Sequence, residues 1–449
     1  MTSARRHLGA GAALSVVVQG GPLLAAGVLS VVIARTIGPS GNGRFALLVT
    51  LTGIAAMVFS LGLSAGITHE VSRGRWSVAR ASRSGYAVGL SFGAVGALAA
   101  LGVFTLLHDS AFHGIRTELA VLALASLPPV LAYQFADAIL LARERYESYA
   151  GLELSHSATF LVVGAALVIP FGLTGAVIAL PAAGAVGAAV GVLLLSREIA
   201  RDHAGSGTGS LPRAVRFGLQ TWGANLLQQV NYRFDVIILG GFASTRDVGV
   251  YSIALTLTGI AWVLPQSLQT VLFPRTASLD EAALTGELAP AESDAALAKA
   301  IRHSVLLSAP AAVLVTLLLL VAVPLLYGSK FHETIALGFV LLPGVLLLGV
   351  GKVLSSALAG RGYPRYSLYV GAVVTPLTLG LYFGLIPVIH EWGAAIASTA
   401  SYAATALLTL VFFRRLTRIA LAEAFVPRAA EVADYWGLVR LARAWRQAR

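Results

Sequence analysis

The chain of 449 residues contains no cysteine, which excludes disulfides, thiolate metal ligands and a cysteine nucleophile. Charged residues make up only 12% of it, whereas an ordinary soluble domain carries roughly 25%. Apolar residues reach 57% and the mean hydropathy is +0.80. The length alone would suggest about three soluble domains, but this composition predicts an integral membrane protein.

The positive charge is in excess, with a formal net charge of +11. A nucleic-acid partner would need a soluble basic domain, and a chain with so little charge has no room for one. The basic residues are therefore interpreted by their position relative to a bilayer.

Long apolar runs predict the fold class. A helix needs about 20 mostly apolar residues to cross a bilayer core, and the runs are continuously apolar, unlike the alternating pattern of transmembrane strands. The sequence thus predicts an all-α polytopic membrane protein with twelve transmembrane helices. These are expected at 8–34, 44–67, 82–107, 118–142, 151–170, 173–195, 215–241, 249–273, 302–326, 334–358, 364–386 and 392–413.

The basic residues support this count. With a cytoplasmic N-terminus, 25 of the 32 Lys and Arg residues fall on the inner side and five on the outer side, as the positive-inside rule requires. The prediction is a multi-pass protein of the cell inner membrane with both termini in the cytoplasm. The two remaining basic residues, Arg233 and Lys352, fall well inside predicted spans.

An internal repeat predicts two parallel six-helix bundles. Residues 43–55 align with residues 249–261 at a constant offset of 206, and seven of the thirteen positions are identical. Both copies open the second helix of a six-helix half, so the halves share one orientation. The expected domains are 1–200, a cytoplasmic linker at 201–214, a second bundle at 215–413, and a basic amphipathic tail at 414–449 on the inner leaflet.

Polar residues within the spans mark a candidate substrate path, since charges in a bilayer usually face a cavity or a partner. The candidate substrate contacts are Arg233, Lys352, Gln19, Asn225, Gln229, Gln266, Gln269 and Arg35, and the candidate ion-coupling residues are Asp235 and Asp137. Alternatives stay open for each kind. Arg233 could pair with Asp235 or extend to the headgroups, and Lys352 could extend to the inner interface. The amides could form interhelical hydrogen bonds, and Asp137 could pair with Arg143 or Arg145.

Several motifs, taken in their order and spacing, resemble the polysaccharide-biosynthesis flippases of the multidrug/oligosaccharidyl-lipid/polysaccharide exporter (MOP) superfamily. They extend over the chain to about residue 413, and lie at 33–45 (IARTIGPSGNGRF), 232–240 (YRFDVIILG), 248–252 (VGVYS), 272–275 (LFPR), 327–331 (YGSKF) and 360–365 (GRGYPR).

The resemblance implies two six-helix bundles that form a V, and movement of a polyprenyl-diphosphate-linked oligosaccharide from the inner to the outer leaflet by alternating access. It implies diphosphate-binding cations, here Arg233 and Lys352. The peptidoglycan-precursor branch has arginines well inside the first helix, where this chain has only Arg35 at the outer end. A lipid-linked sugar and membrane lipids are the expected partners, with a polysaccharide polymerase and glycosyltransferases beside them. A monomer without cofactor, metal or catalytic residues is expected.

Two other functions are open to a membrane protein of this composition. A cation-coupled multidrug exporter of the same superfamily would be expected to carry a deeply embedded carboxylate in its first helices. Residues 8–107 offer none within their spans, and Asp137 and Glu153 lie near inner ends. A membrane glycosyltransferase or polymerase would need positioned carboxylates or a metal. His69-Glu70 and His108-Asp109 are isolated pairs at helix ends, so the sequence predicts a transporter and no enzyme.

Overall fold

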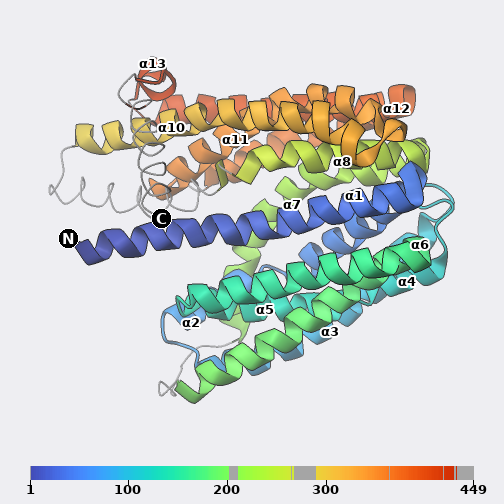
Figure 1. Cartoon of the computed structure of the whole chain (residues 1–449). Coiled ribbons are helices and arrows are strands. Elements are labelled where there is room, and N and C mark those ends of the chain that lie inside the picture. Colours follow the sequence, from blue (N-terminus) through green and yellow to red (C-terminus); the bar gives the residue numbers. More distant parts are fainter. Residues whose placement is uncertain are drawn as a thin grey trace, which may run out of the picture. The chain divides into compact units, whose positions relative to one another are not determined.

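The computed structural model describes residues 2–201, 211–263, 265–266, 290–363, 365–417, 419–428 and 431. These residues are almost entirely helical and contain no strand, so the predicted all-α class is confirmed (Figure 1). The elements are α1 (Thr2–Ser60), α2 (Leu63–Ser72), α3 (Val78–Leu106), α4 (Thr117–Leu124), α5 (Leu127–Ala142), α6 (Tyr146–Arg201), α7 (Leu211–Phe242), α8 (Thr245–Gly259), η1 (Ile260–Trp262), α10 (Pro290–Leu317), η2 (Leu318–Tyr327), η3 (Ser329–Phe331), α11 (Glu333–Gly360), α12 (Arg365–Leu416) and α13 (Leu421–Phe425).

Within the described ranges, seven helical stretches are long and apolar enough to cross a membrane. Three of the long helices contain a break in helical geometry: α1 at Gly38, α6 at Gly172, and α12 at Ile389 and His390. Each break falls where the sequence predicts a connection between two successive spans. The count of twelve spans itself stays a prediction.

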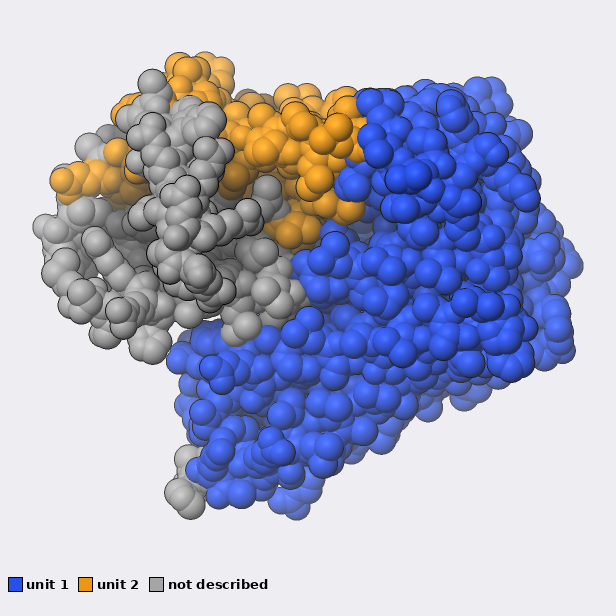
Figure 2. Space-filling view, in the orientation of Figure 1, with its two compact units in different colours: residues 1–257, 318–341, 375–398 blue, residues 258–317, 342–374, 399–449 orange. Residues whose placement is uncertain are grey.

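The chain divides into two compact units, coloured blue and orange in Figure 2. Unit 1 contains residues 1–257, 318–341 and 375–398, and unit 2 contains residues 258–317, 342–374 and 399–449. Each unit is described by itself below. The predicted division into two six-helix bundles with a linker and a tail stays a prediction.

Small residues let α3 pack closely on α5 in unit 1. Gly85, Gly89 and Gly93 recur every fourth residue and form one stripe of α3. A Cβ atom at Gly89 would lie 2.7 Å from the backbone nitrogen of Ala132, and one at Gly93 would lie 2.4 Å from Cα of Pro128. Membrane helices lack a hydrophobic drive toward each other and associate through such close backbone contact.

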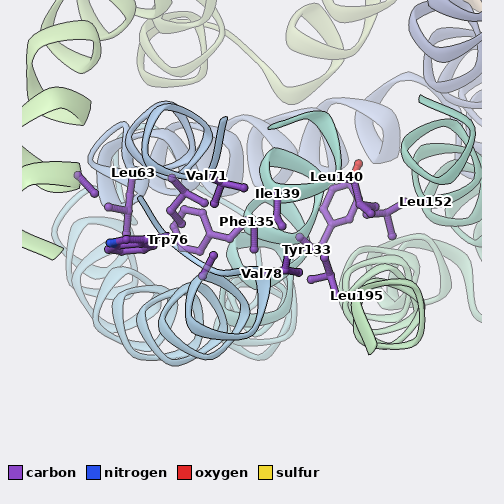
Figure 3. Packing of buried hydrophobic residues seen from close by; sticks show 14 residues of the cluster. Leu63, Val71, Trp76, Val78, Tyr133, Phe135, Ile139, Leu140, Leu152 and Leu195 are labelled. Carbon is purple, nitrogen blue, oxygen red and sulfur yellow. The ribbon is translucent and has the colours of Figure 1, made fainter. Parts of the chain in front are cut away.

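A cluster of buried hydrophobic residues lies beside this contact (Figure 3). Phe135, Ile139 and Leu140 of α5 pack there against residues of α2, α3 and α6, with Trp76 and Tyr133 in the same cluster. The apolar residues of α5 recur at helical spacing, so one face of that helix is wholly inside the unit. Packing in this cluster therefore holds α5 against the start of α6 in unit 1.

The two copies of the sequence repeat contact each other in unit 1. A Cβ atom at Gly43 would lie 1.8 Å from the carbonyl oxygen of Thr245, and one at Gly249 would lie 2.0 Å from that of Pro39. The 206-residue offset relates Gly43 to Gly249 and Pro39 to Thr245, so the two contacts are equivalent. Asn42 Nδ2 adds a hydrogen bond to the carbonyl of Gly249 at 3.0 Å. We call this contact the glycine crossing.

The start of the tail is held on α10 in unit 2 by a buried ion pair. Arg302 Nε donates to both carboxylate oxygens of Glu431, at 2.8 and 2.9 Å, and the Arg302 guanidinium also binds the carbonyl of Glu423. Arg302 and Glu431 are 3% and 5% exposed, so each would be left as a costly buried charge without the other. The predicted amphipathic character of the tail falls mainly on residues 432–449, outside the described residues.

We expect docking of the tail to depend on pH. The hydrogen bonds from Arg302 lower the pKa of the Glu431 carboxyl from its ordinary value of 4.5 to about 2. A lowered pKa in the docked state means that the contact is fully present above pH 4.5 and is lost as the pH falls toward 2. Glu431→Gln should make the tail sensitive to limited proteolysis already at neutral pH. Arg428→Gln, which removes a more exposed arginine of the same segment, is the matched control. Equal protection of Glu431→Gln and the unchanged protein at pH 7 would contradict this role.

Candidate functional site

The candidate site is built on α7, whose sequence places polar side chains at helical intervals within an apolar span. The helix is anchored near its beginning, where Trp222 Nε1 donates to the carbonyl of Met57 at 3.1 Å. Further along, Asn231 and Asp235 are buried, one turn apart, whereas Arg233 between them is exposed. The helix therefore places the Asp235 carboxylate in the interior and the Arg233 guanidinium on an exposed face.

Asp235 is held by hydroxyl groups from two other elements of unit 1. Tyr251 of α8 donates to its Oδ2 at 2.6 Å, Ser398 of α12 donates to the same oxygen at 3.2 Å, and the Val236 amide donates to Oδ1 at 2.8 Å. The Tyr382 hydroxyl adjoins Ser398 at 3.0 Å. These donors stabilise a carboxylate that has no access to water.

The interior of this network also holds an amide oxygen without a donor. Asn231 Nδ2 donates to Thr375 Oγ1 at 3.3 Å, and among the described residues no group donates to its buried Oδ1. Oxygen atoms of hydroxyl, amide and carboxylate groups therefore gather between α7, α8 and α12. The arrangement is compatible with the predicted ion-coupling role of Asp235, which stays a prediction.

Arg233 has no ion pair among the residues that the structure describes. Hydroxyl and amide donors bind both oxygens of the Asp235 carboxylate, and the positive charge of Arg233 acts on it without a direct ion pair. An exposed guanidinium at this place presents five donors in a fixed fork, which suits the oxygens of a diphosphate.

Lys352 belongs to unit 2 and lies in α11. Its Nζ is 4.4 Å from the ring centroid of Trp262, and the side chain is half-buried. Trp262 is fixed by a hydrogen bond from Nε1 to the carbonyl of Val345 at 3.0 Å and by an edge contact with Tyr402. This cation–π contact, which the sequence did not predict, holds the ammonium within the span.

Arg35 binds the backbone at the end of η2. Its Nε and Nη2 donate to the carbonyls of Leu326 and Leu325, both at 2.6 Å. Carbonyl groups at the end of a helix lack intrahelical partners, and a cation there also complements the helix dipole. The substrate contact predicted for Arg35 stays a prediction, while the structure gives it a role in joining α1 to η2.

We expect Arg35→Ala to lower thermal stability more than transport activity per folded molecule. Loss of two charged hydrogen bonds to backbone should cost on the order of 2 kcal/mol. Arg35→Lys should recover only part, since one ammonium cannot reproduce two parallel in-plane bonds. The measurement is the melting temperature of the purified protein beside transport normalised to folded protein. A normal melting temperature combined with lost transport would contradict this assignment.

Only some of the amide side chains predicted to contact substrate lie among the described residues. Gln229 is half-buried and Gln266 is exposed, and Gln228 donates to the Tyr232 hydroxyl at 3.2 Å. Gln269 lies outside the described residues, as do the side chains of Gln19 and Asn225. The substrate contacts predicted for these amides therefore stay predictions.

Of the two arginines suggested as partners of Asp137, Arg145 binds Glu198 instead, from Nε to Oε2 at 2.8 Å. The pairing of Asp137 with Arg143 stays a prediction. Asp137 lies one turn after Tyr133 on α5, and the Tyr133 hydroxyl donates a hydrogen bond to Glu153 of α6. Helical spacing could have indicated this group, because Tyr133 and Asp137 are four residues apart and Glu153 and His156 three apart.

One group of side chains within the described ranges has metal-ligand geometry. Ligand atoms of Asp247, His390 and Glu391 lie within 4.8 Å of one another. Arg246 approaches the same place, with its Nη1 3.7 Å from Asp247 and 2.9 Å from Glu333. Its positive charge compensates these carboxylates, which is the opposite of what a cation site requires.

Comparisons with known proteins define the class. The chain is similar to a multidrug resistance MATE family transporter of the MOP superfamily in an inward-facing conformation, with a TM-score of 0.72 and 16% identity over 89% of this chain and 97% of that one. It is similar to the lipid II flippase MurJ in an inward closed conformation, with a TM-score of 0.69 and 12% identity over 92% and 88%. A mutant of the Vibrio cholerae MATE transporter VcmN gives 0.61 and 14% over 94% and 99%. The protein is a multi-pass membrane protein with the fold of the MOP transporters.

The family follows from the sequence. A model described as "Polysaccharide biosynthesis protein" matches residues 8–280, which is more than half of the chain, and the chain belongs to this family. No curated protein matches the sequence. The polysaccharide-biosynthesis family to which the motifs pointed is thus confirmed, and the solved structures share its fold.

Proposed function

We propose that the protein is a flippase that moves a polyprenyl-diphosphate-linked oligosaccharide from the inner to the outer leaflet of the cell inner membrane by alternating access. Membership of the polysaccharide biosynthesis family is the observation that carries the proposal. The fold shared with a lipid II flippase is in keeping with it.

The chemistry of two cations supports the proposed substrate. Arg233 of α7 is exposed and has no ion pair among the described residues. The ammonium of Lys352, in α11, lies over the ring of Trp262 in η1. A lipid-linked sugar carries its charge in the diphosphate, for which a guanidinium fork and an ammonium are the usual protein ligands. Either side chain, Arg233 in unit 1 or Lys352 in unit 2, could bind that headgroup while the lipid tail stays in the bilayer.

The test is reconstitution with the proposed substrate. Purified protein is placed in liposomes that contain a fluorescent polyprenyl-diphosphate oligosaccharide, and a membrane-impermeant glycosidase measures how much of it reaches the outer leaflet. We expect faster exposure than in protein-free liposomes. Equal rates with verified, folded protein would refute the proposal.

A cation-coupled multidrug exporter is the second candidate, because the fold of this chain is similar to that of a MATE transporter as well as to that of a lipid II flippase. The same liposomes discriminate between the two. Uptake of a cationic dye under a proton or sodium gradient, without sugar-lipid exposure, would favour the exporter. Exposure of the sugar lipid without dye uptake would favour the flippase.

A further inference from the structure

The ammonium of Lys352 lies over an aromatic ring whose own position is fixed from two sides in unit 2. Lys352 Nζ is 4.4 Å from the centroid of the Trp262 ring. Trp262 Nε1 donates to the Val345 carbonyl of α11 at 3.0 Å. The Tyr402 ring of α12 meets the indole with centroids 5.8 Å apart and planes at 67°. Trp262 is therefore held by two helices of the unit that contains Lys352.

The local sequence explains why the Trp262 ring departs from the regular path of α8. The helix ends at Gly259 and continues as the 3-10 turn Ile260–Trp262. Pro265 follows, and a proline has no N–H for the carbonyl four residues before it, here that of Ala261. Each residue of a 3-10 turn rotates further about the axis than a residue of an α-helix. The turn therefore redirects the Trp262 side chain.

One face of α11 packs on this segment. Val345, Gly349 and Lys352 are four and three residues apart, which places them on the same side of a helix. Val345 accepts the indole hydrogen bond, and Lys352 reaches the ring. Between them, a Cβ atom at Gly349 would lie 3.0 Å from Cγ of Pro265. The glycine thus lets the two segments approach closely enough for the cation–π contact.

The sequence repeat indicates that the fold common to both halves does not require this tryptophan. Residues 43–55 align with residues 249–261, and the last six aligned pairs are identical. The next pair is Ala56 and Trp262, where the copies differ by a whole indole. A large side chain that is present in one copy alone favours a role specific to that copy.

An indole suits a lysine that must stay in place and keep its charge. Lysine has a flexible four-carbon stem, and within a span it can extend to the interface. The face of the Trp262 ring attracts the ammonium through its quadrupole. Unlike a carboxylate, the ring carries no net charge, so the positive charge of Lys352 is not cancelled and can still attract an anion.

We propose that Trp262 is a positioning residue that fixes the Lys352 ammonium within the span for binding of the substrate's diphosphate. This role rests on the proposed function, whereas the fixation of the ammonium by the ring does not. Trp262 acts through Lys352, so the effect of removing the ring should depend on the presence of that lysine.

The small number of lysines makes the fixation measurable by NMR. Lys299, Lys330 and Lys352 are the only lysines of the chain, and the first two are exposed. In full-length protein labelled with ¹³C-lysine, the Cε–Hε signal that disappears in Lys352→Arg belongs to Lys352. The ring current of Trp262 should displace it upfield of the other two, and Trp262→Leu should return it to them. Trp222→Leu, which removes another indole bound to a backbone carbonyl, should leave it in place.

A double-mutant cycle tests the consequence for binding. The probe is farnesyl diphosphate, a short polyprenyl diphosphate, and its affinity for the purified protein is compared with that of uncharged farnesol. We expect Trp262→Leu to weaken diphosphate binding about fivefold, as loss of a cation–π contact predicts, and Lys352→Met to weaken it at least as much. In the Lys352→Met background, Trp262→Leu should have no further effect. Farnesol binding should be the same in all four proteins.

A fluorinated ring repeats the test if Trp262→Leu folds poorly. Trifluorinated tryptophan at position 262 keeps the Nε1 donor and nearly the same shape, but its fluorines withdraw electron density from the ring face that attracts the ammonium. Affinity for farnesyl diphosphate should fall in the protein that has Lys352 and stay unchanged in Lys352→Met. A role of Trp262 in packing alone predicts no change in either protein.

The outcomes distinguish failure of the positioning role from failure of the proposed function. An unmoved Lys352 signal in Trp262→Leu, or an equal loss of affinity with and without Lys352, would refute the positioning role. Weaker binding in Lys352→Met but not in Trp262→Leu would refute it while diphosphate binding by Lys352 stands. Full affinity in Lys352→Met would refute both. Coupled losses of affinity without exposure of sugar lipid in liposomes would refute the flippase and support Trp262 as the positioning residue of a diphosphate site.

Discussion

Arg233→Ala combined with Lys352→Ala should reduce exposure of the sugar lipid by about 100-fold. A hydrogen bond to a charged group contributes roughly 1.5–3 kcal/mol, and 1.4 kcal/mol corresponds to about a factor of ten. Each single variant should therefore lose about tenfold or more. The expected loss is large because the diphosphate carries the charge of the proposed substrate.

Lys330→Ala is the control for the loss of one positive charge. Lys330 is exposed in η3, outside the predicted spans, and its removal changes the net charge by the same amount as either single variant. It should transport normally. Arg233→Lys should retain part of the activity, since an ammonium still attracts the diphosphate but cannot bind it in a fork. Unchanged transport by the double variant at normal abundance would refute diphosphate binding by these residues.

Adding a side chain at the glycine crossing should destabilise the whole of unit 1. In Gly43→Ala, the new methyl group would lie 1.8 Å from a backbone carbonyl oxygen of Thr245, and backbone cannot give way as a flexible side chain can. Overpacking of this kind typically costs about 1–3 kcal/mol. Gly249→Ala should have a similar effect, because its contact with Pro39 is equivalent.

The chain provides a matched control in Gly53. It lies in α1 as Gly43 does, and a Cβ atom there would meet nothing within 4 Å. Gly53→Ala should fold normally or slightly better, since alanine favours a helix over glycine. The melting temperature of the purified protein distinguishes the three variants. Equal melting temperatures for Gly43→Ala and Gly53→Ala would show that the backbones separate without cost.

The features that depend on local sequence were the most predictable. Apolar run length predicted the helical class, and the expected connections coincide with the breaks at Gly38, Gly172 and His390. The repeat was also predictable, because it is a similarity within the sequence itself. The contact between its two copies was not, since nothing in the sequence indicates that segments about 206 residues apart pack together.

The site was less predictable, because the partner of a buried charge is chosen by packing and not by proximity in sequence. Arg145 is eight residues from Asp137, yet it binds Glu198, 53 residues further on. Asp235 was placed near Arg233 by sequence, whereas Tyr251 and Ser398 supply its donors. Tyr133 and Glu153 come together because the tight turn after α5 folds α6 back along it.

The glycine crossing also bears on the history of the chain. If the halves arose by duplication, the ancestral copies met at this point as equal partners, each glycine against the carbonyl of the other copy. A substitution at either glycine is then constrained by the backbone of the other copy, so the two positions are not independent. The crossing thus accounts for a glycine in both copies, at positions 43 and 249, where any side chain would meet the backbone of the other copy.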